Sequence, residues 1–333
     1  MYIVTTYSLA VFYCVITMLC WGSWANTQKL AGKTWRYELF YWDYVLGIFL
    51  FSLVFALTLG SFGNDGRGFF EDIRQVSPEY MWGAFWGGVI FNAANILLST
   101  AIALVGMAVA FPVGIGLALV LGVIINYVAA QQGDPVLIFS GVGLIVLAMV
   151  SNALAYREKE KGTSTNPTKG LLIALLAGVL MSLFYRFVAA GIDLDNLSSP
   201  AAGKMTPYTA VVVFSLGIFA SNFIFNSLLM RYPLKGPSVT YKQYAYGRFS
   251  WHLIGVLGGV IWALGNGLNF IAAGVAGPAI SYGLGQGATL VSAIWGVFIW
   301  KEFRRPTPRV RIYLVAMFVL FVTGLLLLVV AGN

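Results

Sequence analysis

Amide side chains lie deep inside the apolar blocks of this sequence, where a polar group is costly unless it meets a partner. Two pairs of asparagines lie three residues apart, a spacing that places both members on one face of a helix. These pairs are Asn92 with Asn95 and Asn266 with Asn269, and a further block carries Tyr282 and Gln286. We predict that these side chains form hydrogen bonds to a small solute. The alternative is that they join helices to one another, as transmembrane asparagine often does.

A cluster of indole, hydroxyl and amide groups ends the first apolar block. It consists of Trp21, Ser23, Trp24, Asn26 and Thr27. Indole stacking combined with amide contacts suits a flat solute that forms hydrogen bonds. The alternative for the tryptophans is anchoring at the membrane surface, where tryptophan is enriched. We predict that all five residues contribute to substrate binding.

Few ionisable side chains fall within the apolar blocks. Asp43 lies among Tyr41, Trp42 and Tyr44, and Glu38 lies at the edge of the same block. An aromatic wall disfavours the charged form of a carboxyl, which is what a proton acceptor needs. An acid in the first turn of a helix also complements the helix dipole, or pairs with a nearby basic residue. We predict proton coupling by Asp43 and Glu38 and keep the structural role as the alternative.

Two basic side chains complete the ionisable set. Arg186 follows Tyr185 within a block, and both are candidate ligands for an oxygen-rich solute. The alternative for Arg186 is a side chain that extends to the membrane surface. His252, the only histidine, begins a block near the cytoplasmic interface, and we expect it to be structural. No metal or disulfide spacing is present, since Cys14 and Cys20 both lie in the first block.

Composition and block length predict the elements that position these residues. Hydrophobic residues make up 59% of the chain and charged residues 10%, against roughly 25% charged residues in soluble domains. The blocks have the length of about 20 residues that crosses a bilayer as a helix. We therefore predict an all-α polytopic membrane protein. Its ten spans are placed at 4–27, 40–61, 81–104, 107–130, 135–156, 170–191, 208–230, 251–274, 278–300 and 310–331.

Two nearly uncharged stretches, 80–130 and 249–300, are each too long for one span. A helix of 50 residues would measure about 75 Å. Each stretch must therefore fold back as a hairpin, with breaks near Gly106 and at Gly277-Pro278.

Lys and Arg residues concentrate on one side of the predicted spans. Sixteen of the twenty fall in the loops after spans 1, 5, 7 and 9, whereas Arg67, Arg74 and Lys204 fall on the opposite side. Basic residues favour the cytoplasmic side of a membrane. We expect an integral plasma-membrane protein, with the bacterial inner membrane as the favoured location and both termini outside. The net charge of +8 is accounted for by the basic loops that orient the spans, so we expect no nucleic-acid partner.

The two halves of the chain resemble each other. GGVI at 87–90 recurs at 258–261, an offset of 171 that aligns Asn95 with Asn266 without a gap, and LGIF at 46–49 recurs at 216–219. We divide the chain into a first five-helix repeat at 1–156, a central cytoplasmic loop at 157–169 and a second five-helix repeat at 170–333. Five spans per repeat invert the second repeat relative to the first. Inverted repeats are typical of secondary transporters, which bind substrate near the midplane and work by alternating access.

Further motifs cover about the first 130 residues. They are Cys20-Trp21-Gly22-Ser23-Trp24, the segment Leu39 through Tyr44 with its Asp43, and the block Gly87 through Tyr127 with Gly87-Gly88-Val89, Asn95, Val105-Gly106 and Ile125-Asn126-Tyr127. In these motifs the chain resembles the ureide permease family of the drug/metabolite transporter (DMT) superfamily. The resemblance implies the EamA-like fold of two inverted five-helix repeats. It also implies proton-coupled uptake of ureides, uracil and related bases, while sister families carry sugars such as glucose, ribose and rhamnose.

The expected function is therefore a secondary active transporter that takes up a ureide, nucleobase or similar heterocycle by proton symport, or with Na⁺ as the coupling ion. The alternatives are a sugar or nucleoside uptake carrier of the same superfamily and, less favoured, a metabolite or drug exporter. An enzyme is disfavoured because the blocks hold one histidine and no acidic cluster. The central loop is too short for the nucleotide-binding-like stretch of plant ureide permeases, so no cofactor is expected. We expect a monomer or homodimer in the lipid bilayer.

Overall fold

The computed structural model describes residues 1–31, 35–63, 65–105, 107–159, 167–233, 236–301, 303 and 306–332. Within these residues the secondary structure is helical, and the one β feature is an isolated bridge between Ile192 and Met205. Ten helical segments of the described chain are long and apolar enough to cross a membrane. Each lies at one of the predicted spans, so the prediction of an all-α polytopic membrane protein is confirmed.

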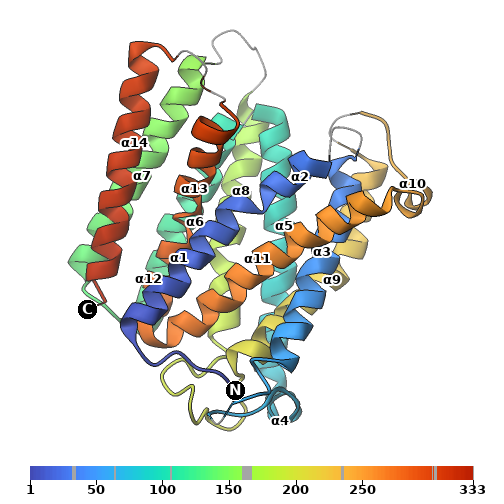
Figure 1. The fold of residues 1–333 in the computed structure, drawn as a ribbon, viewed down its shortest axis with the longest axis vertical. Coiled ribbons are helices and arrows are strands. Elements are labelled where there is room, and N and C mark those ends of the chain that lie inside the picture. Colours follow the sequence, from blue (N-terminus) through green and yellow to red (C-terminus); the bar gives the residue numbers. More distant parts are fainter. Residues whose placement is uncertain are drawn as a thin grey trace.

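The spans are arranged side by side in one bundle (Figure 1). Span 1 consists of α1 (Tyr7–Ser23) and α2 (Ala25–Ala31), and span 9 consists of α12 (Pro278–Gly285), α13 (Ala288–Ile294) and a π-helical turn (Trp295–Ile299). The other spans are α3 (Tyr37–Leu57), α5 (Pro78–Val105), α6 (Met107–Ala130), α7 (Pro135–Lys159), α8 (Pro167–Ala189), α9 (Pro207–Arg231), α11 (Phe249–Ala276) and α14 (Pro308–Val330). Two short helices, α4 (Phe69–Gln75) and α10 (Tyr241–Ala245), lie in connections.

The predicted hairpin break at Gly277-Pro278 is confirmed. Gly277 has a φ of +80°, a left-handed conformation that glycine adopts without strain. Pro278 is the first residue of α12, the helix position that proline favours. The predicted break near Gly106 lies outside the described residues, as do residues 160–166 of the central loop.

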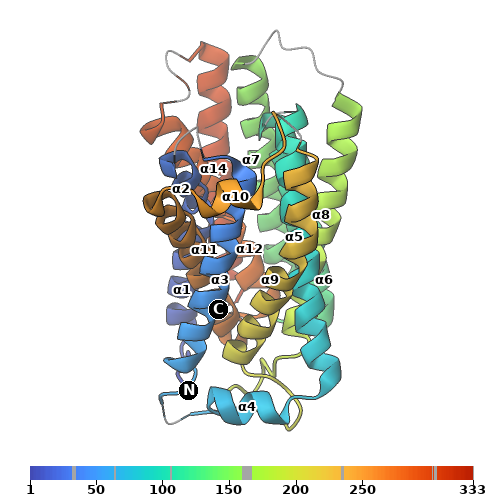
Figure 2. The same cartoon turned by 90° about the vertical axis from the view of Figure 1, so that its right-hand side faces the viewer.

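Equivalent spans of the two halves make equivalent contacts, where span 1 corresponds to span 6, span 2 to span 7, and so on. α5 packs on α8 as α11 packs on α1, and α5 packs on α9 as α11 packs on α3. α7 and α14, which correspond to each other, pack together at one edge of the bundle (Figures 1 and 2). The helix contacts thus have the internal symmetry that two repeats require. The boundaries of the repeats stay a prediction.

The repeated sequence motifs contact each other across the two halves. Gly88 of α5 lies against the carbonyl oxygen of Phe214 on α9, and Gly217 of α9 lies against the carbonyl oxygen of Phe85 on α5. A Cβ atom at either glycine would overlap that oxygen. Both positions therefore require glycine, because small residues let membrane helices approach closely.

The same crossing occurs between α3 and α11. Gly259 lies against the carbonyl oxygen of Tyr44, and Gly47 lies against the carbonyl oxygen of Val256. GGVI of each half thus packs on LGIF of the other half. These close glycine contacts pack α3 against α11 and α5 against α9.

Both ends of the described chain lie on the same face of the bundle, which we call the terminal face (Figure 1). On this face the connection before α5 is joined to the connection before α9. Arg67 donates to the buried Asp72 (Nε to Oδ1, 2.9 Å) and to the carbonyl oxygen of Lys204 (2.7 Å). The second carboxylate oxygen of Asp72 accepts from the backbone N–H of Thr206 (2.8 Å). The two halves are therefore linked here by a buried, charge-assisted network.

Candidate solute-binding site

A cavity lies between the two halves of the chain. Its empty volume is about 730 Å³, including its open side. Each half contributes seven lining residues. The first half provides Trp21, Trp24, Ala25, Phe91, Asn95, Leu98 and Ile115. The second half provides Met181, Phe184, Trp262, Gln286, Ala288, Thr289 and Ser292.

Two pairs of lining residues are related by the internal repeat. Phe91 corresponds to Trp262 and Ile115 corresponds to Gln286, each at the offset of 171 that aligns the GGVI motifs. The rings of Phe91 and Trp262 are in contact, with centroids 4.6 Å apart. Equivalent positions of the two halves therefore meet at the cavity.

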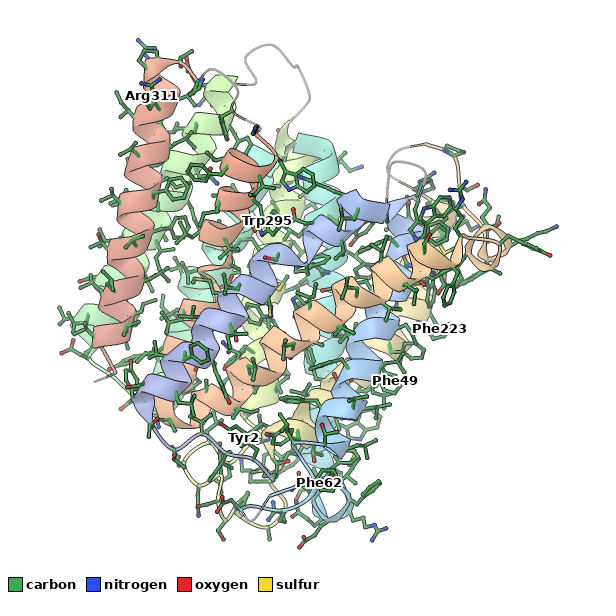
Figure 3. All side chains as sticks on the ribbon, in the orientation of Figure 1. Tyr2, Phe49, Phe62, Phe223, Trp295 and Arg311 are labelled. Atoms are coloured by element: carbon green, nitrogen blue, oxygen red, sulfur yellow. The ribbon has the colours of Figure 1, made fainter. Side chains whose placement is uncertain are left out.

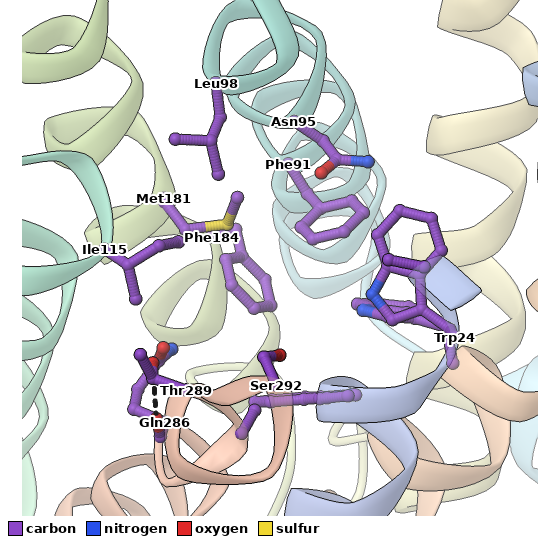
Figure 4. Close-up of a pocket in the computed structure, with 14 residues that line it drawn as sticks. Trp24, Phe91, Asn95, Leu98, Ile115, Met181, Phe184, Gln286, Thr289 and Ser292 are labelled. Carbon is purple, nitrogen blue, oxygen red and sulfur yellow. Dashed lines mark hydrogen bonds between the residues drawn. The ribbon is translucent and has the colours of Figure 1, made fainter. Parts of the chain in front are cut away.

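The lining residues that the structure describes combine aromatic rings with neutral polar groups, and none of them is charged. Trp21 stacks on Trp262 with centroids 6.0 Å apart and an angle of 11° between the ring planes. Asn95, Gln286 and Ser292 face the common space, together with Thr289 (Figure 4). A site of this kind suits a neutral solute with a flat or ring-shaped body and hydrogen-bonding edges, because an ion would find no opposite charge.

Two of the lining residues lie where a helical span tightens locally to i→i+3 hydrogen bonds. The carbonyl oxygen of Trp24, between α1 and α2, accepts from the N–H of Thr27, and that of Gln286, between α12 and α13, accepts from the N–H of Thr289. Thr289 donates its hydroxyl to the carbonyl oxygen of Gln286 (3.2 Å). Short 3₁₀ stretches of this kind turn the side chains that follow them relative to a regular α-helix. Neither stretch was predicted from the sequence.

Of the predicted ligands, Trp21, Trp24, Asn95 and Gln286 line the cavity. Thr27 does not, because it is buried and donates to the carbonyl oxygen of Trp24 (2.6 Å). It therefore supports the turn between α1 and α2 from outside the cavity.

Ser23 and Asn26 also lie outside the lining. The hydroxyl of Ser23 accepts from Trp295 Nε1 (2.9 Å), and Oδ1 of Asn26 accepts from Trp300 Nε1 (2.7 Å). Trp295 lies near the α1–α2 junction (Figure 3). These two residues join the end of span 1 to the end of span 9.

Asn92 supports a lining residue instead of lining the cavity itself. The hydroxyl of Tyr41 donates to Oδ1 of Asn92 (2.8 Å) and accepts from Nδ2 of Asn95 (3.1 Å). Asn92 in turn donates to the hydroxyl of Ser221 on α9 (2.9 Å). This chain fixes the orientation of the Asn95 amide.

Three predicted ligands in the second half are buried outside the lining. Asn269 donates to the carbonyl oxygen of Ser281 (2.8 Å), and Tyr282 donates to that of Ala118 (3.2 Å). Asn266 is 1% exposed, and neither polar atom of its amide has a hydrogen-bond partner among the described residues. Asn95 thus reaches the cavity, whereas its repeat equivalent Asn266 does not.

The predicted pair Tyr185 and Arg186 is split between interior and surface. Tyr185 is fully buried and stacks on Phe270 with centroids 4.5 Å apart. Arg186 is exposed and does not line the cavity. The placement of Arg186 matches the surface alternative.

The predicted coupling residues lie apart from the cavity. Glu38 pairs with Arg36 (Oε2 to Nε, 3.1 Å). Asp43 is buried, and its partners are His252 (2.8 Å) and Tyr244 (2.7 Å). The contact between Asp43 and His252 was not predicted from the sequence.

The aromatic residues Phe91, Phe184 and Trp262 were not predicted as ligands, nor were Thr289 and Ser292. For Phe91 and Trp262, the offset of the internal repeat could have indicated a role in the site. Phe91 and Trp262 follow GGVI in the two halves at equal distances, and both are aromatic. Equivalent aromatic positions beside the aligned asparagines would have been reasonable candidates.

Comparison with known proteins shows which transport proteins this chain resembles. The sequence profile of the family described as ureide permease matches residues 40–166 and 154–331. Ureide permease 1 of Arabidopsis thaliana is 24% identical to this chain, and the alignment covers 100% of this chain and 99% of the relative. Glucose uptake protein GlcU of Bacillus subtilis is 28% identical, with 66% of this chain and 67% of the relative covered.

Other relatives extend the similarity. The putative sugar uptake protein YxfA of Lactococcus lactis is 24% identical over 97% of this chain and 98% of its own length. One solved crystal structure superposes with a TM-score of 0.62 at 16% identity, covering 96% of this chain and 97% of the other. At that identity the superposition is informative about the fold alone.

Proposed function

The chain belongs to the ureide permease family, and on this premise we propose that it takes up a small, neutral, ring-shaped solute by proton-coupled alternating access. It is a transporter of small solutes in a membrane. The favoured substrate is a ureide, nucleobase or similar heterocycle. The favoured orientation in the plasma membrane has both termini outside.

The cavity between the halves is the observation that carries this proposal. Among the described residues its lining is uncharged and comes from both halves, as expected for a site at the interface of two repeats. Amide groups such as those of Asn95 and Gln286 each offer a donor and an acceptor. The edge of a nucleobase or hydantoin offers the complementary pair, while its face suits Trp21, Trp24 and Trp262.

Asp43 supports proton coupling. It is the buried acid of α3, and its side chain is 2% exposed. Glu38 is the weaker candidate, because its carboxylate is already paired with Arg36. Transport of a neutral solute against its gradient needs a coupled ion, and a buried carboxyl can bind one proton per cycle.

Sugar uptake is the second candidate. It is favoured by the relatives named as a glucose uptake protein and a putative sugar uptake protein. Aromatic faces and neutral polar groups also suit a pyranose or furanose ring.

Counterflow in proteoliposomes separates these candidates. Vesicles preloaded with unlabelled allantoin, uracil, a nucleoside, ribose or glucose are diluted into the labelled compound. We expect transient accumulation of a heterocycle and none of glucose or ribose. Accumulation of sugars alone would favour the second candidate, and accumulation of none of these compounds would contradict the proposed substrate class. Protein-free vesicles are the control.

A further inference from the structure

A second group of polar side chains lies outside the cavity, around Asp43. Oδ1 of Asp43 accepts a hydrogen bond from the hydroxyl of Tyr244 (2.7 Å) and lies 2.8 Å from Nδ1 of His252. The side chain of Asp43 is 2% exposed and that of His252 is 21% exposed. Helices α3, α10 and α11 thus bring together a buried carboxyl, a hydroxyl and the only imidazole of the chain.

The surrounding residues are shaped to hold this group. Gly255, one turn beyond His252, lies against the side chain of Asp43, and a Cβ there would overlap it. The buried ring of Trp35 contacts His252 edge to face at 5.0 Å and stacks on Tyr244 at 6.2 Å. The carboxyl and the imidazole are therefore held in place and are partly shielded from water.

The nearest charged neighbours on α3 pair with each other. Arg36 forms an ion pair with Glu38 and also donates to the carbonyl oxygen of Pro237. In the part of the chain that the structure describes, His252 is the one basic side chain in ion-pair contact with Asp43. The balance of charge at this buried carboxyl therefore depends on whether His252 is protonated.

The basic groups of α10 and the start of α11 lie over aromatic rings. Lys242 lies 6.0 Å from the ring centroid of Tyr246, and Arg248 lies 5.3 Å from that of Trp251. Burial, together with the neighbouring carboxylate, raises the pKa of Tyr244 above its usual value. The Tyr244 hydroxyl therefore remains a donor at neutral pH and adds no charge of its own.

We infer that Asp43 and His252 hold one exchangeable proton between them and that this pair is the proton-coupling site, an inference that rests on the proposed function. In the protonated pair the imidazolium donates Nδ1–H to Oδ1 and the two charges balance. The departing proton comes from Nε2, which faces Gly247 in the connection before α11. Its loss leaves a neutral imidazole beside a buried carboxylate whose charge is no longer balanced, a costly state that favours rearrangement.

One residue connects this pair to the cavity. Tyr44 follows Asp43 in α3, and its ring lies 4.4 Å from that of Trp24, which lines the cavity. Tyr44 is fully buried, and its hydroxyl has no hydrogen-bond partner among the described residues. A shift of α3 on protonation would therefore change the wall of the cavity directly.

The variants His252→Asn and Asp43→Asn test the inference. The amide of His252→Asn can donate to Asp43 from near the position of Nδ1, but it carries no exchangeable proton in the physiological range. The control is Tyr241→Phe on α10, the helix that also carries Tyr244, because the hydroxyl of Tyr241 contacts Ser227 instead of Asp43. Each variant is measured in proteoliposomes for solute exchange and for uptake driven by a proton gradient.

We expect His252→Asn and Asp43→Asn to keep solute exchange, which also shows that they fold, and to lose at least tenfold in proton-driven accumulation. Tyr241→Phe should accumulate solute as the unmodified protein does. Full accumulation by a folded His252→Asn variant would overturn the inference.

A second readout does not depend on transport. His252 is the only histidine, so protein purified without a histidine tag gives a single NMR signal from isotope-labelled histidine. Because Nδ1 of His252 lies 2.8 Å from Oδ1 of Asp43, we expect the pH dependence of this signal to differ between the unmodified protein and Asp43→Asn. Identical titrations in the two proteins would overturn the pairing. Solute exchange without any proton-driven accumulation by the unmodified protein would instead overturn the coupling in the proposed function.

Discussion

Gly88 and Gly259, which are 171 residues apart, make the same contact on two different pairs of helices. Gly88 lies against the carbonyl oxygen of Phe214, and Gly259 lies against that of Tyr44. Phe214 and Tyr44 are themselves 170 residues apart. The internal repeat of the sequence therefore corresponds to two equivalent helix crossings, each made of one helix from each half.

Gly88→Ala should destabilise the protein, because the added methyl group would overlap the backbone of α9. Overpacking of this kind costs about 1–3 kcal/mol. The measurement is the melting temperature of the purified protein in detergent. Gly143→Ala on α7 is the matched control, since nothing lies within 4 Å of a Cβ there. A Gly88→Ala variant as stable as the control would contradict the close crossing.

The ten spans could be predicted because a membrane span is a local property of about 20 apolar residues. The break at Gly277-Pro278 could be predicted for the same reason, because its signal lies in two adjacent residues of the sequence. The local 3₁₀ turns at Trp24 and Gln286 could not be predicted in the same way. Glycines beside Gln286 resemble other glycines of this chain that pack helices together, such as Gly88 and Gly259.

Gln286→Ala should weaken substrate binding. Loss of one partner leaves a polar group of the bound solute unpaired, at a cost of about 1–3 kcal/mol, which corresponds to about 5–150-fold in affinity. Affinity is measured by competition in the counterflow assay or by calorimetry in detergent. Asn26→Ala is the matched control, because that side chain contacts Trp300 outside the cavity. Equal affinities of the two variants would argue against the cavity as the binding site.

Arg67→Ala should destabilise the terminal face. The substitution leaves the carboxylate of Asp72 buried with its charge unpaired, and breaking a buried ion pair from one side costs about 3–5 kcal/mol. Thermal unfolding measures the loss. Arg74→Ala is the control. Arg74 lies on α4, the helix that carries Asp72, and its loss removes an exposed charge, so stability should change by no more than about 0.5 kcal/mol. A similar small change for Arg67→Ala would show that the network is not needed for stability.

Both termini should face outward. Sixteen of the twenty basic residues lie on the opposite side of the predicted topology, and the positive-inside preference then orients the chain. Paired reporters that are active on one side of the membrane only, fused after residue 333, measure the orientation. Activity of the cytoplasmic reporter at that position would reverse the assignment.

Only part of the lining of the candidate site could be predicted from the sequence, for a physical reason. A polar residue inside an apolar block is visible in the sequence, and Asn95 and Gln286 were found in that way. Whether such a residue faces a cavity, as Gln286 does, or another helix, as Asn92 does, depends on packing between distant spans. The contact between Asp43 and His252 could not be predicted for the same reason, because it depends on how α3 packs against α11.

The crossing of α3 with α11 also has a consequence for biosynthesis. Gly47 and Gly259 are about 210 residues apart in sequence, and ribosomes add about 5–20 residues per second. The glycine face of α3 therefore remains without its partner for about 10–40 s after it is made. During that interval lipid or another protein must cover it, and the final pairing of α3 forms only after most of the chain has been made.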